Sequence, residues 1–437
     1  MRITDDREYV FRLGSISGIM VSLVYAWQAR IRRRGRPVEL DVRAAITFMC
    51  GVSMMGKLFS EHHLQRLFEK PDFQPASGFS AAGLDAVYIE NEPYRGNRTT
   101  VFAWMGLPEL KPGQLCPAMV LLHGGGGTAF DEWVRLWNAR GYAAIVIDQC
   151  GCQPQSPVVD GEPHDRNPDG GPPGWDQSVF QINDPLTDQW QYHAIAAAIR
   201  AHSLLAHHPD VDAQRIGVTG ISWGGYMTCL VAGVDERLKC AVPVYGCGFL
   251  GENSGWKYGL FPTRPEADIK KWLEHWDPAA FLPQARMPFL WVNGTNDFAY
   301  PMDSWQKSYD LQGGPQQLCL RIEMPHGHPP GWEPVEIMDY ADRQLKGKQP
   351  LTEITEFDRD TDSLWARYES PDPIREAMVC FTRAEGYWGD RKYNELSAVI
   401  DHENRRVTAT IPSMSTVCYL NLIDQQDRVT STRHICL

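Results

Sequence analysis

Residues 215–226 read RIGVTGISWGGY and contain one serine among four glycines. An apolar run is followed by Gly220, Ser222 and Gly224 in the pattern Gly-x-Ser-x-Gly. A serine on a sharp strand-to-helix turn needs glycine two positions away on either side, because a Cβ there would hold the strand and the helix apart. The pattern therefore predicts a buried strand, then a nucleophilic Ser222 whose oxygen the turn lifts above the sheet edge, and a helix directly after it. A chance match in a glycine-rich chain is the alternative, and the strand-turn-helix context argues against it.

A second glycine-rich loop, His123-Gly124-Gly125-Gly126-Gly127, follows the apolar run PAMVLL. Loops of this kind supply one backbone N–H of an oxyanion hole, and the residue after the nucleophile supplies the other. We therefore predict an oxyanion hole made by Trp223 and by Gly125 or Gly126. His123 is expected to order this loop and to line the substrate site. A phosphate-binding loop is the alternative, but neither the P-loop pattern nor the spacing Gly-x-Gly-x-x-Gly is met.

Composition limits the class of protein. The chain has 437 residues, which favours two domains plus an extension. A hydrophobic share of 43% and a charged share of 22% are typical of soluble globular proteins. A formal net charge of -12 argues against nucleic acid or an anionic membrane as the main partner.

The eleven cysteines contain no Cys-x-x-Cys pair and favour mostly reduced, buried thiols. The compartment stays open, with the cytoplasm slightly favoured over secretion.

The region from residue 80 to 347 alternates short apolar runs with helical segments. The runs read as buried strands, and this alternation predicts an α/β fold with a mostly parallel, doubly wound sheet covered by helices on both faces. Helices are expected at 130–140, with Gly141 as a left-handed cap, and at 185–207. The expected strands are 86–90, 99–104, 117–122, 143–147, 215–219, 240–244, 289–293 and 318–323.

The two ends of the chain have other patterns. Residues 351–437 show short alternating runs without a long helix, which predicts an all-β sandwich domain. The runs are 363–368, 377–382, 406–411, 416–423 and 429–435.

Residues 1–79 are expected to form a helical N-terminal extension. Its apolar stretch 13–27 is short for a membrane span of about 20 residues, and its arginines follow it rather than precede it, unlike a signal peptide. An amphipathic arm, or a true start at Met49 or Met55, remains open, and no membrane partner is expected.

The stretch VDAQRIGVTGISWGGY, residues 211–226, resembles the α/β-hydrolase superfamily. It is most similar to the branch that holds dienelactone hydrolases, acetyl xylan esterases and the catalytic domains of prolyl oligopeptidases. The resemblance covers about residues 80 to 347 and implies an α/β-hydrolase fold. It also implies that a catalytic acid and then a histidine follow the serine along the chain.

The resemblance points to particular residues for these roles. Gly294-Thr295-Asn296-Asp297 follows an apolar strand, as the family's acid does, so Asp297 is the expected acid, with a helix-capping role as the alternative. His326 stands where the family places its histidine, and His328 is the alternative base. No further ligand follows these two histidines at metal spacing, so we expect neither a metal nor another cofactor.

The expected activity is that of a serine hydrolase that cleaves a carboxylic ester through an acyl-enzyme. The resemblance favours a small-molecule or carbohydrate ester, such as an acetyl ester, as substrate. The alternatives are a serine peptidase of the prolyl oligopeptidase type, although no propeller repeat is present, and a non-catalytic binding scaffold. The oligomeric state stays open.

Two segments are expected to form the walls of the substrate site. One is the Pro- and Gly-rich loop at 150–183, with Trp175 and Asp176; the other carries Trp256, Tyr258 and Phe261.

Overall fold

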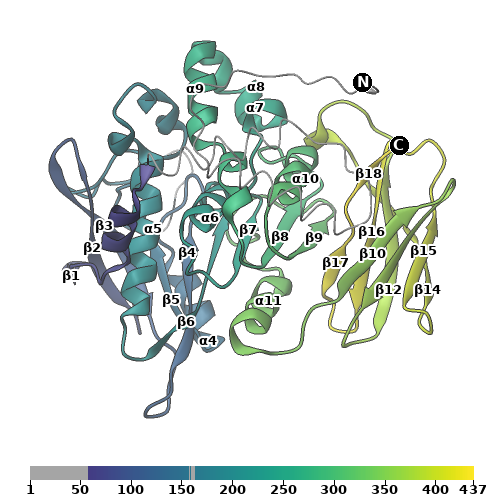
Figure 1. Cartoon of the computed structure of the whole chain (residues 1–437), viewed down its shortest axis with the longest axis horizontal. Helices are drawn as coiled ribbons and strands as arrows, with labels where there is room; N and C mark the ends of the chain where they lie inside the picture. The colour runs from purple at the N-terminus through teal and green to yellow at the C-terminus, as the bar shows by residue number, and fades with distance from the viewer. Residues whose placement is uncertain (1–57, 157, 159–162) are drawn as a thin grey trace, which may run out of the picture. The chain divides into compact units, whose positions relative to one another are not determined.

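A computed structural model describes residues 58–156, 158 and 163–437 (Figure 1). All of them fall in the second of the two units into which the chain divides, residues 47–437. The predictions of an amphipathic arm and of an alternative start concern residues 1–57 and lie outside the described residues.

A nine-stranded sheet forms the centre of the α/β unit (Figure 1). Its order is β1-β2-β3-β5-β4-β6-β7-β8-β9, and all neighbours from β5 to β9 are parallel, whereas β1, β2 and β3 join antiparallel. β4, β5, β7 and β8 are buried along their whole length, as strands covered on both faces must be. The predicted doubly wound, mostly parallel sheet is confirmed. The strands are β1 (Phe73–Pro75), β2 (Asp85–Tyr94), β3 (Asn97–Gly106), β4 (Cys116–Leu122), β5 (Ala143–Ile147), β6 (Val211–Ile221), β7 (Ala241–Val244), β8 (Phe289–Gly294) and β9 (Gln316–Arg321).

Two groups of helices cover the faces of this sheet (Figure 1). α4 (Asp131–Ala139) lies with α11 (Val335–Lys346), and the Tyr142 hydroxyl that follows α4 donates to Asp342 of α11 at 2.8 Å. α5 (Trp190–Ala206) lies with α3 (Glu61–Phe68) and α6 (Trp223–Val234). Because α5 packs against the sheet and both neighbouring helices, it is buried almost all round.

The two predicted helices are present with shifted ends. Gly141 has the expected positive φ of 85° after α4. The helix expected at 185–207 begins later, because Pro185 precedes a short 3₁₀ turn, Leu186–Asp188.

The predicted boundary at residue 80 needs correction. β1 pairs antiparallel with β2 and forms one edge of the nine-stranded sheet. α3 is tied to α5, since the Ser203 hydroxyl donates to the Leu67 carbonyl at 2.8 Å. Residues 58–79 are therefore part of the α/β unit. A three-residue exposed strand gives no periodic signal from which the sequence could have revealed this.

The C-terminal residues form two antiparallel sheets packed face to face, as predicted. One sheet has the order β10-β11-β15-β14 and the other β13-β12-β16-β17, with β18 paired to β16. Their shared core includes Leu364, Val379, Phe381 and Leu420. The strands are β10 (Glu353–Arg359), β11 (Ser363–Glu369), β12 (Ile374–Thr382), β13 (Asn394–Ser397), β14 (Val399–Asp401), β15 (Arg406–Thr410), β16 (Val417–Asp424), β17 (Val429–Ser431) and β18 (Ile435–Cys436). β10, β13 and β14 were not expected, because they are mostly exposed and carry no apolar alternation.

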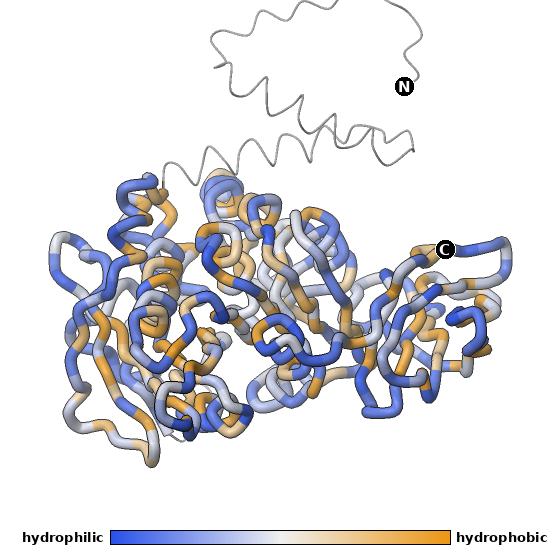
Figure 2. Tube along the Cα trace, turned by 60° about the horizontal axis from the view of Figure 1, so that its bottom comes forward, coloured by the Kyte–Doolittle hydropathy of each residue, from blue (hydrophilic) through white to orange (hydrophobic). Residues whose placement is uncertain are grey.

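The sandwich also packs against the α/β unit. Alternate residues of β16 face opposite ways: Cys418 and Leu420 enter the sandwich core, whereas Val417 and Tyr419 join the core of the α/β unit. Figure 2 shows apolar residues among the strands of both parts and hydrophilic residues on the outer loops. β9, the other edge of the large sheet, is covered in this way rather than left open.

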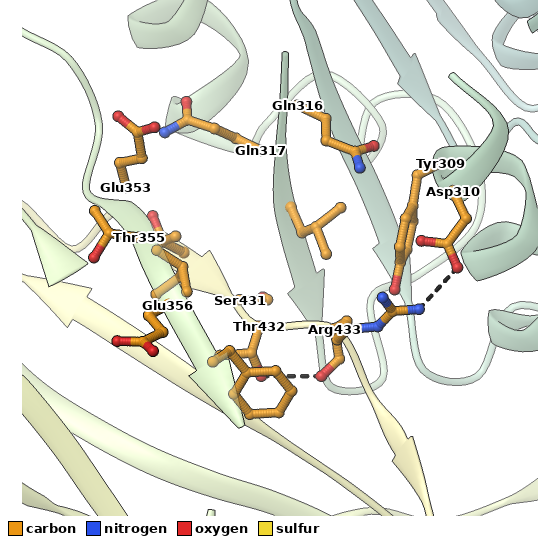
Figure 3. Close-up of a pocket in the computed structure, with 14 residues that line it drawn as sticks. Tyr309, Asp310, Gln316, Gln317, Glu353, Thr355, Glu356, Ser431, Thr432 and Arg433 are labelled. Atoms are coloured by element: carbon orange, nitrogen blue, oxygen red, sulfur yellow. Dashed lines mark hydrogen bonds and ion pairs between the residues drawn. The ribbon is translucent and has the colours of Figure 1, made fainter. Parts of the chain in front are cut away.

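A cleft of about 260 Å³ opens where β9 meets the sandwich (Figure 3). Gln316 and Gln317, at the first residues of β9, line it, and Arg433 crosses it to an ion pair with Asp310 at 2.8 Å. This is the amino end of a parallel strand. Active sites of open α/β sheets lie at the opposite, carboxyl ends.

A buried carboxylate holds the sandwich to the α/β unit. Glu336 of α11 is fully buried and accepts two bonds from Arg321 of β9, at 2.6 and 2.8 Å. Its Oε1 also accepts the backbone N–H of Val429 in β17 at 2.6 Å. One side chain thus joins a helix, the edge strand and the sandwich.

Replacing Glu336 with alanine should lower the free energy of unfolding by about 3–5 kcal/mol, because Arg321 and the Val429 N–H would be left without this partner. The matched control is Glu356→Ala, whose exposed side chain pairs with Arg367 at 3.5 Å and whose loss should cost less than about 1 kcal/mol. Urea unfolding followed by tryptophan fluorescence measures both. Equal losses in the two variants would contradict this role of Glu336.

Candidate active site

Ser222 lies on the tight turn that joins β6 to α6. Its φ is 57°, a left-handed conformation that non-glycine residues rarely adopt, and its N–H donates to the Val244 carbonyl at 2.9 Å. A Cβ on Gly220 would lie 2.1 Å from the Gly224 carbonyl oxygen, and one on Gly224 would lie 1.8 Å from that of Leu122. The two glycines therefore allow the close crossing that the sequence pattern requires.

The serine, one histidine and the predicted acid form a continuous hydrogen-bonded chain. His326 Nε2 lies 2.8 Å from Ser222 Oγ, and its Nδ1 lies 2.7 Å from Asp297 Oδ2. The three residues follow the carboxyl ends of β6, β8 and β9, which meet at one edge of the sheet. This is the geometry in which a histidine can take a proton from a serine hydroxyl while a carboxylate fixes its tautomer.

Asp297 is oriented by the backbone that follows it. Its Oδ1 accepts the N–H groups of Ala299 and Tyr300 at 3.0 and 2.7 Å, and the residue is 2% exposed. The next helix, α10 (Met302–Leu311), begins after Pro301 and has no side-chain cap. The helix-capping alternative for Asp297 therefore does not describe its contacts.

His328, the alternative base, has a different partner. Its Nε2 accepts the Gly124 N–H at 2.9 Å, which leaves the proton of a neutral ring on Nδ1. Burial, together with the nearby His123 and His326, lowers the pKa of His328 to about 3. The structure thus brings His326 to Ser222 and uses His328 to hold the glycine loop.

The glycine loop leaves two backbone donors free beside the serine. Within the described chain, the N–H of Gly124 donates to His328 and that of Gly127 to the Gly124 carbonyl, whereas Gly125 and Gly126 are exposed and their N–H groups have no acceptor. Trp223 is the first residue of α6, where backbone N–H groups lack intrahelical partners. These are the donors predicted for an oxyanion hole.

The prediction that His123 lines the substrate site is wrong. Its side chain is fully buried, and its Nδ1 donates to the Gly124 carbonyl at 3.0 Å. Burial lowers its pKa, so the ring is held neutral. The Gln149 side-chain amide donates to the His123 carbonyl at 2.6 Å. His123 therefore orders the loop, the other part of the prediction, and has no surface with which to touch a ligand.

The two predicted walls meet beside Trp223. The Trp256 indole N–H donates to Asp176 at 2.8 Å, and its ring contacts that of Trp223 at a centroid distance of 4.8 Å. Trp175 is half-buried, with its ring edge-on to His123 at 6.0 Å. Of the predicted wall residues, Trp256 is thus the one that adjoins the Ser222 turn most directly.

The other two aromatic residues of the second wall differ from each other. Tyr258 is 58% exposed and faces Tyr387 of the sandwich domain, with the ring centroids 5.5 Å apart. Phe261 is buried against Trp272 and belongs to the core, so its assignment to the wall is wrong.

Two aromatic residues that the sequence analysis did not name contact the histidine. Tyr245 stacks on His326 at a centroid distance of 4.6 Å, and Phe298 lies against the same ring at 4.9 Å. Tyr245 has a positive φ of 56° directly after β7, and Phe298 follows the predicted acid. Their places at the carboxyl ends of strands were the signal that could have identified them.

The described residues also bear on metal binding and on membrane insertion. No group of three histidine, cysteine or carboxylate side chains there is placed to bind a metal ion. No described helix has the length and apolar character that crossing a bilayer requires.

Comparison with known proteins places this site in context. An acetyl xylan esterase from Paenibacillus sp. R4 has a similar structure, with a TM-score of 0.51, 22% identity and coverage of 67% of this chain and 99% of that one. Acetyl xylan esterase 1 from Thermoanaerobacterium sp. JW/SL YS485 covers 65% of this chain and 92% of its own, with a TM-score of 0.48 and 17% identity. At such identities the first likeness shows a shared fold.

Among curated proteins, the uncharacterized peptidase YuxL of Bacillus subtilis (strain 168) is 24% identical over 221 residues, 48% of this chain. The aligned part is 30% of that relative, so the chain matches less than a third of its length.

The sequence model of the family described as acetyl xylan esterase (AXE1) matches residues 56–277, slightly more than half of the chain. This match begins close to Leu58, where the described part of the α/β unit begins, and it includes the serine turn and the glycine loop. The chain therefore belongs to the acetyl xylan esterase (AXE1) family of carboxylic ester hydrolases, within the α/β-hydrolase superfamily.

Proposed function

We propose that this protein is a serine esterase that removes acetyl or other small acyl groups from a carbohydrate through an acyl-enzyme. Ser222 Oγ attacks the acyl carbonyl carbon while its proton passes to His326 Nε2. The carbonyl oxygen becomes an oxyanion held by the N–H groups of Trp223 and of Gly125 or Gly126. His326 then gives its proton to the departing sugar hydroxyl, and the acyl group stays on Ser222.

The second half of the reaction uses the same groups. His326 takes a proton from water, the resulting hydroxide attacks the acyl-serine, and the proton returns to Ser222 Oγ as the carboxylic acid leaves. Asp297 stabilises the imidazolium formed in both halves. The observation that carries this proposal is the chain of contacts from Ser222 through His326 to Asp297, at 2.8 and 2.7 Å.

The substrate class is supported by the family match, since the matching model is described as that of acetyl xylan esterases. A peptidase is the second candidate, because the match to YuxL, named an uncharacterized peptidase, covers nearly half of this chain. The rates on acetylated xylan and on aminoacyl p-nitroanilides separate the two candidates. The intact set of Ser222, His326 and Asp297 argues against the inert scaffold.

Ser222→Ala should abolish both hydrolysis of p-nitrophenyl acetate and labelling by a fluorophosphonate. A loss of about 10³-fold or more in kcat is expected, because the nucleophile is removed while the oxyanion donors remain. Ser413→Ala, which changes an exposed serine of the sandwich domain, is the control and should retain both signals. Normal turnover by Ser222→Ala would refute the serine mechanism.

The two neighbouring histidines should differ in their effect on the pH profile. His326→Ala should remove nearly all activity, because no other base among the described residues contacts Ser222. His328→Gln should lower kcat by displacing the glycine loop but should keep the acid limb of the pH profile in place.

The reason lies in the charge of His328, which stays neutral until about pH 3 and so cannot produce an acid limb above that pH. Profiles of kcat/KM between pH 4 and pH 9 measure this. Disappearance of the acid limb in His328→Gln would assign the base to His328 instead.

A further inference from the structure

A second cleft, of about 630 Å³, lies beside the turn that carries Asp297. One side is formed by α7 (Leu250–Asn253) and α8 (Gly255–Tyr258), and the other by the segment of the sandwich domain between β12 and β13. We call it the aromatic cleft. Its lining includes Asn253, Tyr258, Gly386, Tyr387, Trp388 and Asp390.

The aromatic cleft adjoins the catalytic histidine through one residue, Phe298. The Phe298 ring lies 4.9 Å from that of His326 and is 57% exposed, although it is a large apolar side chain. Its carbonyl oxygen accepts a hydrogen bond from the Tyr387 hydroxyl. Phe298 thus forms the border between the proposed reaction centre and the cleft.

The sandwich segment is held firmly at this border. Gly389 approaches so closely that a Cβ there would lie 3.3 Å from Phe298 Cα. Lys392 forms an ion pair at 2.7 Å with Glu323, which precedes His326 by three residues. The segment therefore contacts both the turn that carries Asp297 and the residues that precede His326.

The chemistry of the cleft fits a sugar. The rings of Tyr258 and Tyr387 meet edge to face at 5.5 Å; Tyr258 is exposed and Tyr387 half-buried. Apolar C–H faces of a sugar ring pack on aromatic surfaces of this kind. Asp390 is exposed, and no described residue bonds its carboxylate side chain, so its oxygens are available to sugar hydroxyls. Burial, with Asp297 nearby, raises the pKa of Tyr387 to about 12, so its hydroxyl remains a neutral donor.

We propose that the C-terminal sandwich domain determines substrate selectivity: Tyr387, with Tyr258 and Asp390, forms a subsite for the sugar units next to the esterified one. This inference rests on the proposed esterase function and extends it. A β-domain attached to the edge of the α/β sheet then has a direct part in the reaction. It would favour esters on an oligosaccharide over esters of small alcohols, because only the longer substrate reaches across Phe298 into the cleft.

The test is the ratio of kcat/KM for acetylated xylo-oligosaccharides to kcat/KM for p-nitrophenyl acetate. Tyr387→Ala should lower this ratio about tenfold, mainly through KM for the oligosaccharide, because the ring that contacts the sugar is removed. Tyr387→Phe keeps the ring and should retain most of the ratio. Phe73→Ala removes an exposed aromatic residue from β1, the far edge of the sheet, and should leave the ratio unchanged.

A binding measurement separates failure of this subsite from failure of the proposed chemistry. In the Ser222→Ala protein, unacetylated xylo-oligosaccharide should bind by calorimetry, and adding Tyr387→Ala should weaken that Kd about tenfold. If Tyr387→Ala lowers kcat/KM equally for both substrates, Tyr387 only stabilises the Asp297 turn. That result would overturn the subsite. An unchanged ratio, or sugar binding that is insensitive to Tyr387, would overturn it as well. Absence of esterase activity with Tyr387-dependent sugar binding would refute the proposed function and leave the subsite standing.

Discussion

The crossing of α6 over the ends of β4 and β6 is the contact on which the site depends. Gly224 lies so close to the Leu122 carbonyl that no side chain fits between them, and Gly220 lies as close to Gly224. This contact forces Ser222 into its left-handed conformation and lifts its hydroxyl beyond the sheet edge. It also starts α6 at Trp223, directly beside the loop that follows β4. The position of Ser222 and that of the free backbone N–H groups beside it are therefore consequences of one packing constraint.

Hydrogen bonding around this contact leaves a specific set of groups free. His328 accepts a hydrogen bond from the Gly124 N–H, and the Gly124 carbonyl accepts from His123 and from the Gly127 N–H. The Gln149 side-chain amide donates to the His123 carbonyl at the start of the loop. The groups that remain free are the backbone N–H groups of Gly125 and Gly126, which are exposed beside the serine. Three histidines lie close together, yet burial keeps His123 and His328 neutral, and His326 has contacts with both a hydroxyl and a carboxylate. Environment, rather than residue type, distinguishes their roles.

The sandwich domain covers the open edge of the large sheet, and it also reaches the rim of the site. β9 ends the large sheet and would otherwise present unpaired backbone groups to solvent. The sandwich covers that edge with side chains: Ser431 accepts the Leu320 N–H at 2.8 Å, and Asn421 donates to the Leu320 carbonyl at 3.1 Å. Because β9 leads directly into the loop that carries His326, a domain fixed to this edge also reaches the rim of the site. The position of Tyr387 beside Phe298 follows from this attachment.

Features that local backbone geometry and burial impose could be predicted from the sequence alone. The glycine spacing predicted the serine turn, and uninterrupted apolar runs predicted the buried strands, since both record constraints between residues close in the chain. Asp297 was found by its place after β8 in a resembling pattern, and its catalytic role stays a prediction. The strands β1, β10, β13 and β14 are short or exposed, so their sequences contain no pattern that predicts a strand.

Which surfaces meet could be learned from the three-dimensional arrangement alone. His326 and His328 are two residues apart after the same strand, and what distinguishes them is the partner each reaches, Ser222 or Gly124. His123 carried no sign of its complete burial, and Tyr387 lies 165 residues from the serine, in another domain. Contacts of this kind depend on how separate layers pack, and the periodicity of a single segment contains no information about them.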